Sequence, residues 1–161
     1  LLNMINQKNK TVIHNVSSYF INSELYLNTM IQKSNILIGN EDEINALKCK
    51  LQIDDLRLLF RINLNLSAIF VTYGKLGSKI FYNNGYIEMV AANEALSTSP
   101  VGTGDSYSAG IVYGISQNWS YSDCAKFASE LAAISVESHT SYPNIEKVKE
   151  LKNKNNVRRI K

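Results

Sequence analysis

The sequence predicts an α/β fold, a three-layer sandwich around a mostly parallel sheet with an antiparallel hairpin near one edge. Two observations lead to this prediction. Short apolar runs, typical of buried parallel strands, alternate along the chain with stretches of helical character. In addition, residues 79–82 and 86–91 flank Asn83-Asn84-Gly85, which is a strong hairpin signal.

The expected elements can be justified in chain order. A β-rich run and two apolar runs predict strands, and the segments around them have the composition of helices. Before the hairpin we expect strands at 11–16, 35–39 and 67–72 and helices at 23–33, 40–48 and 54–62. After it come an apolar helix beginning near Asp105 and a second helix from about Tyr121 to Glu137, which carries small residues that permit close packing.

Composition and length restrict the class of protein. At 161 residues with 45% hydrophobic content, the chain can bury a core. It has no apolar run of the roughly 20 residues needed to span a membrane, and it has no signal-peptide pattern. Cys49 and Cys124 lie far apart and lack the spacing of metal ligands. We therefore expect buried or idle thiols in a reducing cytoplasm. We therefore expect a cytoplasmic protein without a membrane partner, and a fragment, because the chain starts at Leu1 without Met.

The net charge of +3 comes from the C-terminal end. Seven of the 17 basic residues but only two of the 14 acidic ones fall in residues 145–161, so residues 1–144 are net acidic. This end has no aromatic residues, which argues against a nucleic-acid surface. We expect a folded portion of a larger domain at 1–144 to be followed by a charged tail at 145–161, helical or fraying, and no nucleic-acid partner.

Three unusual segments follow expected strands: Asn40–Glu43, Gly74–Ser78 and Gly102–Asp105. Ligands of α/β sheets bind outside the carboxyl ends of the strands, so these segments should converge on one site. The third is the most specific. Its glycines allow backbone amides to surround an anion, and Asp105 would accept the proton of an attacking hydroxyl. The alternative is that Asp105 only caps a helix.

The other two segments also allow two interpretations each. Asn40 and Glu43 have the spacing of a capping box, and they would also suit a water-coordinated Mg²⁺ beside phosphates. Thr72–Ser78 would be either a glycine-rich turn or a loop that approaches a nucleotide, with hydroxyls at both ends. Neither a Walker A sequence nor a dinucleotide fingerprint occurs, so ATP would have to bind by another route.

Together these segments resemble the ribokinase-like (PfkB) carbohydrate and nucleoside kinases over residues 11–144. The N-x-x-E motif matches Asn40–Glu43, T-x-G-x-x-G-S matches Thr72–Ser78, and G-x-G-D matches Gly102–Asp105. The resemblance implies ATP as co-substrate with Mg²⁺, and a nucleoside or sugar as acceptor.

The resemblance also assigns roles to residues. Asp105 would be the catalytic base, and the amides of Gly102, Thr103 and Gly104 would form the anion hole. Glu43 would serve Mg²⁺ through water. The residues that would bind or border ATP are Asn40, Thr72, Gly74, Gly77, Ser78 and Ser129.

The stretch around the G-x-G-D motif looks most like the bacterial adenosine-kinase branch, so adenosine is the leading acceptor. Ser99 stands where the family usually has Asp near a monovalent-cation site, and this difference argues against activation by K⁺. The family's N-terminal, acceptor-binding half has no counterpart in this chain. The sequence therefore leaves open a truncated, inactive remnant or a kinase for ribose or fructose, and it leaves the oligomeric state open.

Overall fold

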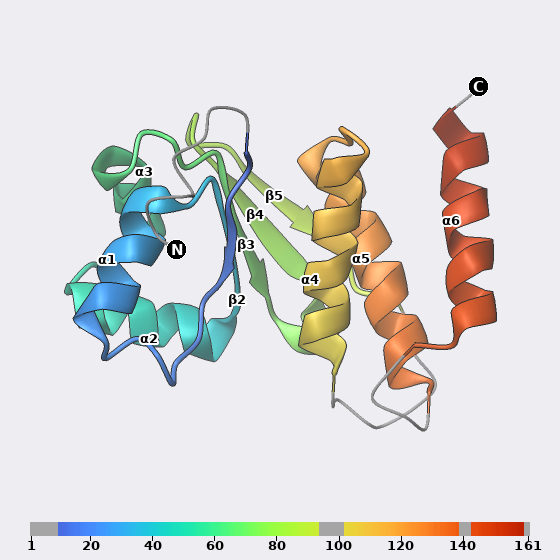
Figure 1. Ribbon diagram of the computed structural model, residues 1–161, viewed down its shortest axis with the longest axis horizontal. Helices are drawn as coiled ribbons and strands as arrows, with labels where there is room; N and C mark the ends of the chain where they lie inside the picture. Colours follow the sequence, from blue (N-terminus) through green and yellow to red (C-terminus); the bar gives the residue numbers. More distant parts are fainter. Residues whose placement is uncertain (1–9, 94–101, 139–142, 160–161) are drawn as a thin grey trace. The chain divides into compact units, whose positions relative to one another are not determined.

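The strands form one five-stranded sheet in the order β1-β2-β3-β4-β5. The computed structural model describes residues 10–93, 102–138 and 143–159 (Figure 1). Adjacent pairs among the first three strands are parallel, and these strands are β1 (Ile13–Asn15), β2 (Ile36–Asn40) and β3 (Ala68–Thr72). The register aligns Asn40 with Thr72, so two of the predicted site residues lie at the carboxyl ends of neighbouring strands.

The last two strands, β4 (Ser78–Tyr82) and β5 (Ile87–Val90), form the predicted hairpin. The Tyr82 amide donates to the Tyr86 carbonyl at 3.0 Å, and Gly85 has a φ of 86° in the turn. So short a connection joins antiparallel strands. A mostly parallel sheet with helices and an antiparallel hairpin at the edge confirms the predicted fold class.

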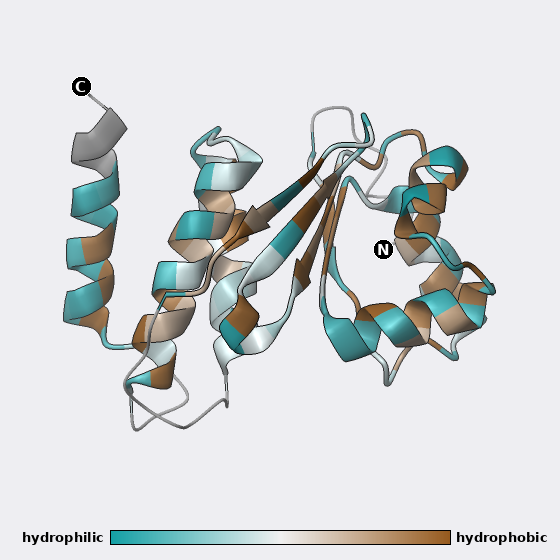
Figure 2. Cartoon of the chain, turned by 180° about the vertical axis from the view of Figure 1, so that it is seen from behind, coloured by the Kyte–Doolittle hydropathy of each residue, from teal (hydrophilic) through white to brown (hydrophobic). Residues whose placement is uncertain are grey.

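The contacts divide the chain into two units, the first comprising residues 1–72 and 79–88. In the first unit, β2 and β3 are buried along nearly their whole length, as expected for strands with apolar runs. Both strands are largely brown in Figure 2. The helical elements of this unit are α1 (Glu24–Lys33), α2 (Glu41–Leu51), the 3₁₀ turn η2 (Leu56–Leu58) and α3 (Leu59–Ile62).

The predicted helix at 54–62 is shorter in the structure and begins as a 3₁₀ turn. Asp55 accepts a hydrogen bond from the Arg57 amide at 2.9 Å, and this local bond ends the extended segment before the turn. Short polar side chains such as Asp compete for backbone donors in this way, so the helix starts after the position that its composition suggested.

The second unit comprises residues 73–78 and 89–161. It contains the 3₁₀ turn η3 (Gly74–Leu76) and three helices, α4 (Thr103–Ser116), α5 (Tyr121–Val136) and α6 (Ile145–Arg159). α4 and α5 pack closely where Gly110 meets Ala128. A Cβ at Gly110 would lie only 2.5 Å from the Ala128 Cα, so glycine is needed for this approach. The small residues predicted to permit close packing therefore do so at this interface.

The charged tail forms α6, which packs beside α5 (Figure 1). Leu151 is 5% exposed, and the Lys147 ammonium lies 2.7 Å from the Glu137 carboxylate. Of the two forms that the sequence left open, the structure has the helical one. Among the described residues, no helix is long and apolar enough to cross a membrane.

Candidate active site

Asn40 and Glu43 form a complete capping box at the start of α2. The Glu43 amide donates to the Asn40 Oδ1 at 2.9 Å, and the Asn40 amide donates to the Glu43 Oε2 at the same distance. The capping interpretation of this motif is therefore confirmed. Since the box uses Oε2 alone, the second carboxylate oxygen of Glu43 has no hydrogen-bond partner in the described part of the chain.

This donor set would give Mg²⁺ a single carboxylate oxygen, that of Glu43. Magnesium retains several waters and needs few protein ligands, so one free carboxylate oxygen beside bound phosphates is sufficient. Among the described residues, no three His, Cys, Asp or Glu side chains gather to hold an ion by themselves. The first unit thus brings Asn40, Glu43 and Thr72 together at one end of the parallel strands.

The loop Tyr73–Ser78 belongs to the second unit and is a tight, ordered turn. The Tyr73 amide donates to the Gly77 carbonyl at 2.8 Å. Gly77 has a φ of 93°, and a Cβ there would lie 2.1 Å from the Val90 carbonyl oxygen. No side chain fits at that distance, so the close backbone packing is by itself enough to require glycine at this position.

Ser78, at the end of the same motif, is only 4% exposed. Its Oγ accepts a hydrogen bond of 2.9 Å from the Tyr107 hydroxyl of α4. Burial raises the pKa of Tyr107 to about 12, so this phenol stays protonated to a higher pH than an exposed tyrosine. The two glycine-containing motifs of the second unit are therefore joined by a buried hydrogen bond.

The start of α4 has no side-chain cap. Gly102 is the N-cap residue, with a φ of 81° that favours glycine, and the first intrahelical bond runs from the Ser106 amide to the Gly102 carbonyl at 3.0 Å. The preceding amides have no partner within the helix, as at every uncapped start. They include the predicted anion-hole amides of Gly102, Thr103 and Gly104.

Asp105 is the third residue of α4, so the interpretation of this side chain as the N-cap is wrong. The side chain is exposed, and its carboxylate makes no hydrogen bond to the described residues. A Cβ at Gly104 would meet nothing within 4 Å, so open space lies in front of this turn. The helix start can therefore accept an anion at its amides and place a free carboxylate beside it.

Ser129 of α5 makes hydrogen bonds to the segment after β5. Its Oγ donates to the Ala91 carbonyl at 3.3 Å and accepts from the Asn93 amide at 3.2 Å. The hydroxyl thus holds the segment after β5 against α5. Its predicted contact with ATP stays a prediction.

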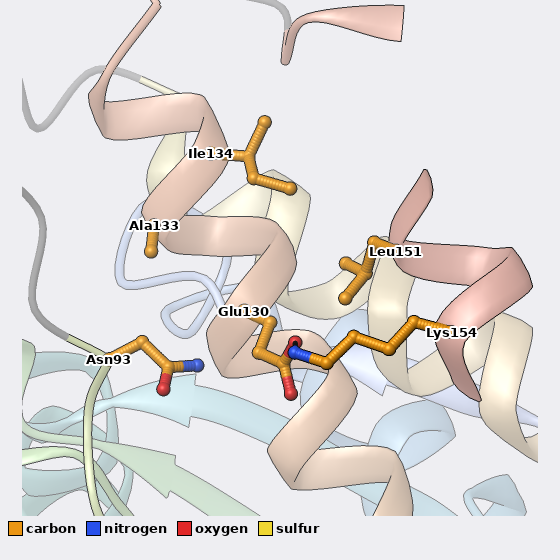
Figure 3. Close-up of a pocket in the computed structure, with 6 residues that line it drawn as sticks. All are labelled: Asn93, Glu130, Ala133, Ile134, Leu151 and Lys154. Atoms are coloured by element: carbon orange, nitrogen blue, oxygen red, sulfur yellow. Dashed lines mark hydrogen bonds and ion pairs between the residues drawn. The ribbon is translucent and has the colours of Figure 1, made fainter. Parts of the chain in front are cut away.

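A shallow cavity of about 440 Å³, largely open to solvent, lies beside this segment (Figure 3). Lys154 lies 3.5 Å from Glu130 there, and the Lys154 side chain is 54% exposed, so this ion pair contributes little to stability. The lining residues are Asn93, Glu130, Ala133, Ile134, Leu151 and Lys154.

Sequence reasoning did not identify Tyr107, Asn93 or Lys154. Tyr107 follows Asp105 by two residues, and this position was the available signal, since Tyr107 lies on the buried face of α4. Asn93 and Lys154 had no sequence signal, because they come to line one cavity only in the folded chain. Ser99 lies outside the described residues.

His14 has a structural role. Its Nδ1 lies 2.8 Å from the Ser34 Oγ, and the Ser34 hydroxyl itself donates to the Met30 carbonyl. Nδ1 therefore carries the proton and donates. Burial lowers the pKa of His14, so the neutral ring is the form that this site favours.

The geometry of the uncapped helix start and the three motifs agree with a comparison of the whole sequence with family models. The model of the pfkB family carbohydrate kinases matches residues 1–148. The chain belongs to the pfkB family. The family expected from the three motifs is therefore confirmed.

Curated relatives of this pfkB-family chain include two kinds of kinase. A nucleoside kinase of Methanothermobacter thermautotrophicus is 34% identical over 110 residues, covering 68% of this chain and 34% of the relative. A 5-dehydro-2-deoxygluconokinase of Clostridium tetani is 25% identical over 132 residues, covering 80% of this chain and 39% of the relative. The chain thus spans between one third and two fifths of these curated relatives.

Among solved structures, the pfkB-family chain is similar to a nucleoside kinase of Methanocaldococcus jannaschii, described as an archaeal member of the ribokinase family. The TM-score is 0.77 at 23% identity, covering 95% of this chain and 52% of that one. At this identity the similarity establishes the ribokinase-like fold and leaves the acceptor open.

Proposed function

We propose that the intact protein carrying this chain transfers the γ-phosphoryl group of ATP to a hydroxyl of a nucleoside or sugar. The observation that carries the proposal is the start of α4. Its amides have no partner within the helix, its N-cap is a glycine, and Asp105 lies exposed and unbonded beside open space. A helix that needed only stability would gain from a side-chain cap here.

In the proposed reaction, Asp105 accepts the acceptor's hydroxyl proton while the acceptor oxygen forms a bond to the γ-phosphorus. The bond from that phosphorus to the β–γ bridging oxygen breaks, and ADP leaves. The amides of Gly102, Thr103 and Gly104 stabilise the charge on the transferring group. Because phosphoryl transfer depends mainly on positioning and electrostatics, an ordinary carboxylate suffices as the base.

The remaining motif residues would hold ATP. The loop with Gly74, Gly77 and Ser78 would lie along the nucleotide, and Asn40 and Thr72 would face its phosphates. Mg²⁺, which shields phosphate charge when bound, would be reached through water by the free oxygen of Glu43. The cavity beside the segment that Ser129 holds has room for the base, and its Asn93 amide could recognise the edge of that base.

Adenosine is the leading acceptor, giving AMP by transfer to the 5′-hydroxyl. The nucleoside kinase relative supports this choice, since it is the more similar in sequence of the two relatives described above. The 5-dehydro-2-deoxygluconokinase relative supports a sugar-acid acceptor as a second candidate. Ribose and fructose remain alternatives from the sequence, as does an inactive remnant. We further propose that the protein acts in the cytoplasm.

The test is an acceptor panel with the intact protein, ATP and Mg²⁺. Adenosine, inosine, ribose, fructose and 5-dehydro-2-deoxygluconate are each incubated with the enzyme, and both ADP and the phosphorylated acceptor are quantified. We expect stoichiometric transfer to one class of acceptor. ATP binding without transfer to any acceptor would support the inactive remnant instead.

A further inference from the structure

A buried hydrogen bond links the predicted nucleotide loop to the helix that carries Asp105. The Tyr107 hydroxyl donates to the Ser78 Oγ at 2.9 Å, across 29 positions of sequence. Tyr107 is 5% exposed and Ser78 is 4% exposed, so water does not compete for the bond. Both residues belong to the second unit.

The direction of this bond matters for Ser78. Since the phenol donates, the Ser78 hydroxyl keeps its own proton, and this proton has no acceptor among the described residues. A hydroxyl that accepts one hydrogen bond becomes a better donor in a second. Because Ser78 is buried, the bond fixes the end of the loop to α4 and does not present the hydroxyl to solvent.

The rest of the loop has little freedom to adjust. Gly77 packs against the backbone of Val90–Ala92, closer than any side chain would allow. Ser129 in turn bonds the Ala91 carbonyl and the Asn93 amide to α5. These contacts hold the loop on the side of the segment after β5. A fixed distance from Asp105 also requires a contact with α4, and the hydrogen bond from Tyr107 provides it.

We propose that Tyr107 is a positioning residue of the kinase, whose hydroxyl fixes Ser78 and the nucleotide loop against the turn of α4 that carries Asp105. The proposal rests on the proposed function. Tyr107 would touch neither substrate. It would act by keeping the phosphate-binding loop in register with the amides that receive the transferring group, where small displacements are costly.

The experiment compares Tyr107→Phe, Ser78→Ala and the double variant in the intact protein. Tyr107→Phe keeps the ring and removes only the hydroxyl. We expect each single variant to lower kcat/KM for ATP about tenfold with an unchanged KM for the acceptor, and the double variant to lose no more than either single one. Ser78→Thr, which keeps a hydroxyl, should restore most of the activity.

The matched control is Tyr113→Phe, on the same helix. The Tyr113 ring packs against Trp119 and Phe127, and its hydroxyl makes no hydrogen bond to the described residues. This variant should retain wild-type kinetics. Wild-type kcat and KM for ATP in Tyr107→Phe, or losses that multiply in the double variant, would overturn the inference.

The dissociation constant for ATP, measured by calorimetry on the same proteins, separates the two proposals. A wild-type protein that binds ATP but phosphorylates no acceptor contradicts the proposed function, and a weaker affinity in Tyr107→Phe would still support the positioning role. An active enzyme with unchanged ATP affinity and unchanged turnover in Tyr107→Phe contradicts the positioning role alone.

Discussion

Both α2 and α4 begin with backbone amides that have no partner within the helix, but only α2 caps its amides with side chains. At α2, Asn40 and Glu43 satisfy each other's amides in a capping box. At α4, Gly102 provides no side-chain cap, and Asp105 stands in the position that Glu43 occupies in α2 without making the corresponding bond. Both carboxylates are the third residue of their helix, yet only one is used to complete the helix.

This difference shows that the α2 start is closed by side chains, whereas the α4 start is left open. A capping box is worth about 1 kcal/mol, so leaving α4 open costs stability. The open start leaves amides and a carboxylate available to a substrate. Within the same helix, the buried bond between Tyr107 and Ser78 joins α4 to the loop at 73–78.

The largest effect is expected for Asp105→Asn. Removing the proposed base should lower kcat by about 10² to 10⁴-fold while the ATP affinity and the melting temperature stay unchanged. Steady-state kinetics and calorimetry of the intact protein measure these quantities. The control is Asp123→Asn, the third residue of α5, whose carboxylate accepts from Ser120 at 2.7 Å. The control should retain its turnover, and an active Asp105→Asn would remove the contrast between the two helix starts.

Gly77→Ala should disturb the loop that is tied to α4. A Cβ 2.1 Å from the Val90 carbonyl oxygen forces the backbone apart, and the positive φ adds strain, for a loss of roughly 3 kcal/mol in the free energy of unfolding. Chemical denaturation of the intact protein measures it. Gly74→Ala is the control, since a Cβ there meets nothing within 4 Å and only the φ cost of about 1 kcal/mol remains. Equal losses would show that packing at Gly77 is unimportant.

Asn40→Ala should break the capping box and lower the free energy of unfolding by about 1 kcal/mol. Asp42→Ala in the same turn has no cap to lose and should change stability by a few tenths of a kcal/mol. Denaturation curves of both variants make the comparison. If Asn40→Ala is as stable as the wild-type protein, the cap does not distinguish α2 from α4.

The smallest effect is a pH dependence at high pH. Tyrosine in an unfolded chain titrates near pH 10, and burial raises the pKa of Tyr107 to about 12 in the folded protein. The folded state therefore holds the proton more tightly, so the stabilisation is complete below pH 10 and is lost as the pH rises from 10 to 12. Melting temperatures measured across this window should fall less steeply for Tyr107→Phe, while Tyr113→Phe should retain the wild-type slope.

Much of the fold could be predicted from local patterns. The buried strands β2 and β3 follow from runs of apolar residues, and the hairpin follows from Asn83-Asn84-Gly85. The start of α2 follows from the spacing of Asn40 and Glu43. These features depend on residues within a few positions of one another, where periodicity and hydrogen-bonding geometry are decisive.

Other features could not be predicted, because they depend on contacts between distant segments. The hydrogen bonds of Ser129 and the cavity beside α6 each require knowledge of which groups meet in space. The role of Asp105 as a non-capping residue depends on where α4 begins. That boundary is set by the left-handed conformation of Gly102, which composition alone does not reveal.

The family of the protein follows from the sequence, because three motifs occur in the order and at the spacing typical of pfkB kinases. Tertiary structure alone decided how those motifs are held. Gly77 is constrained by the backbone of Val90–Ala92, and Ser78 is held by Tyr107. The reason is physical: a motif specifies which groups are available, whereas burial and long-range hydrogen bonds specify which of them remain free to meet a substrate.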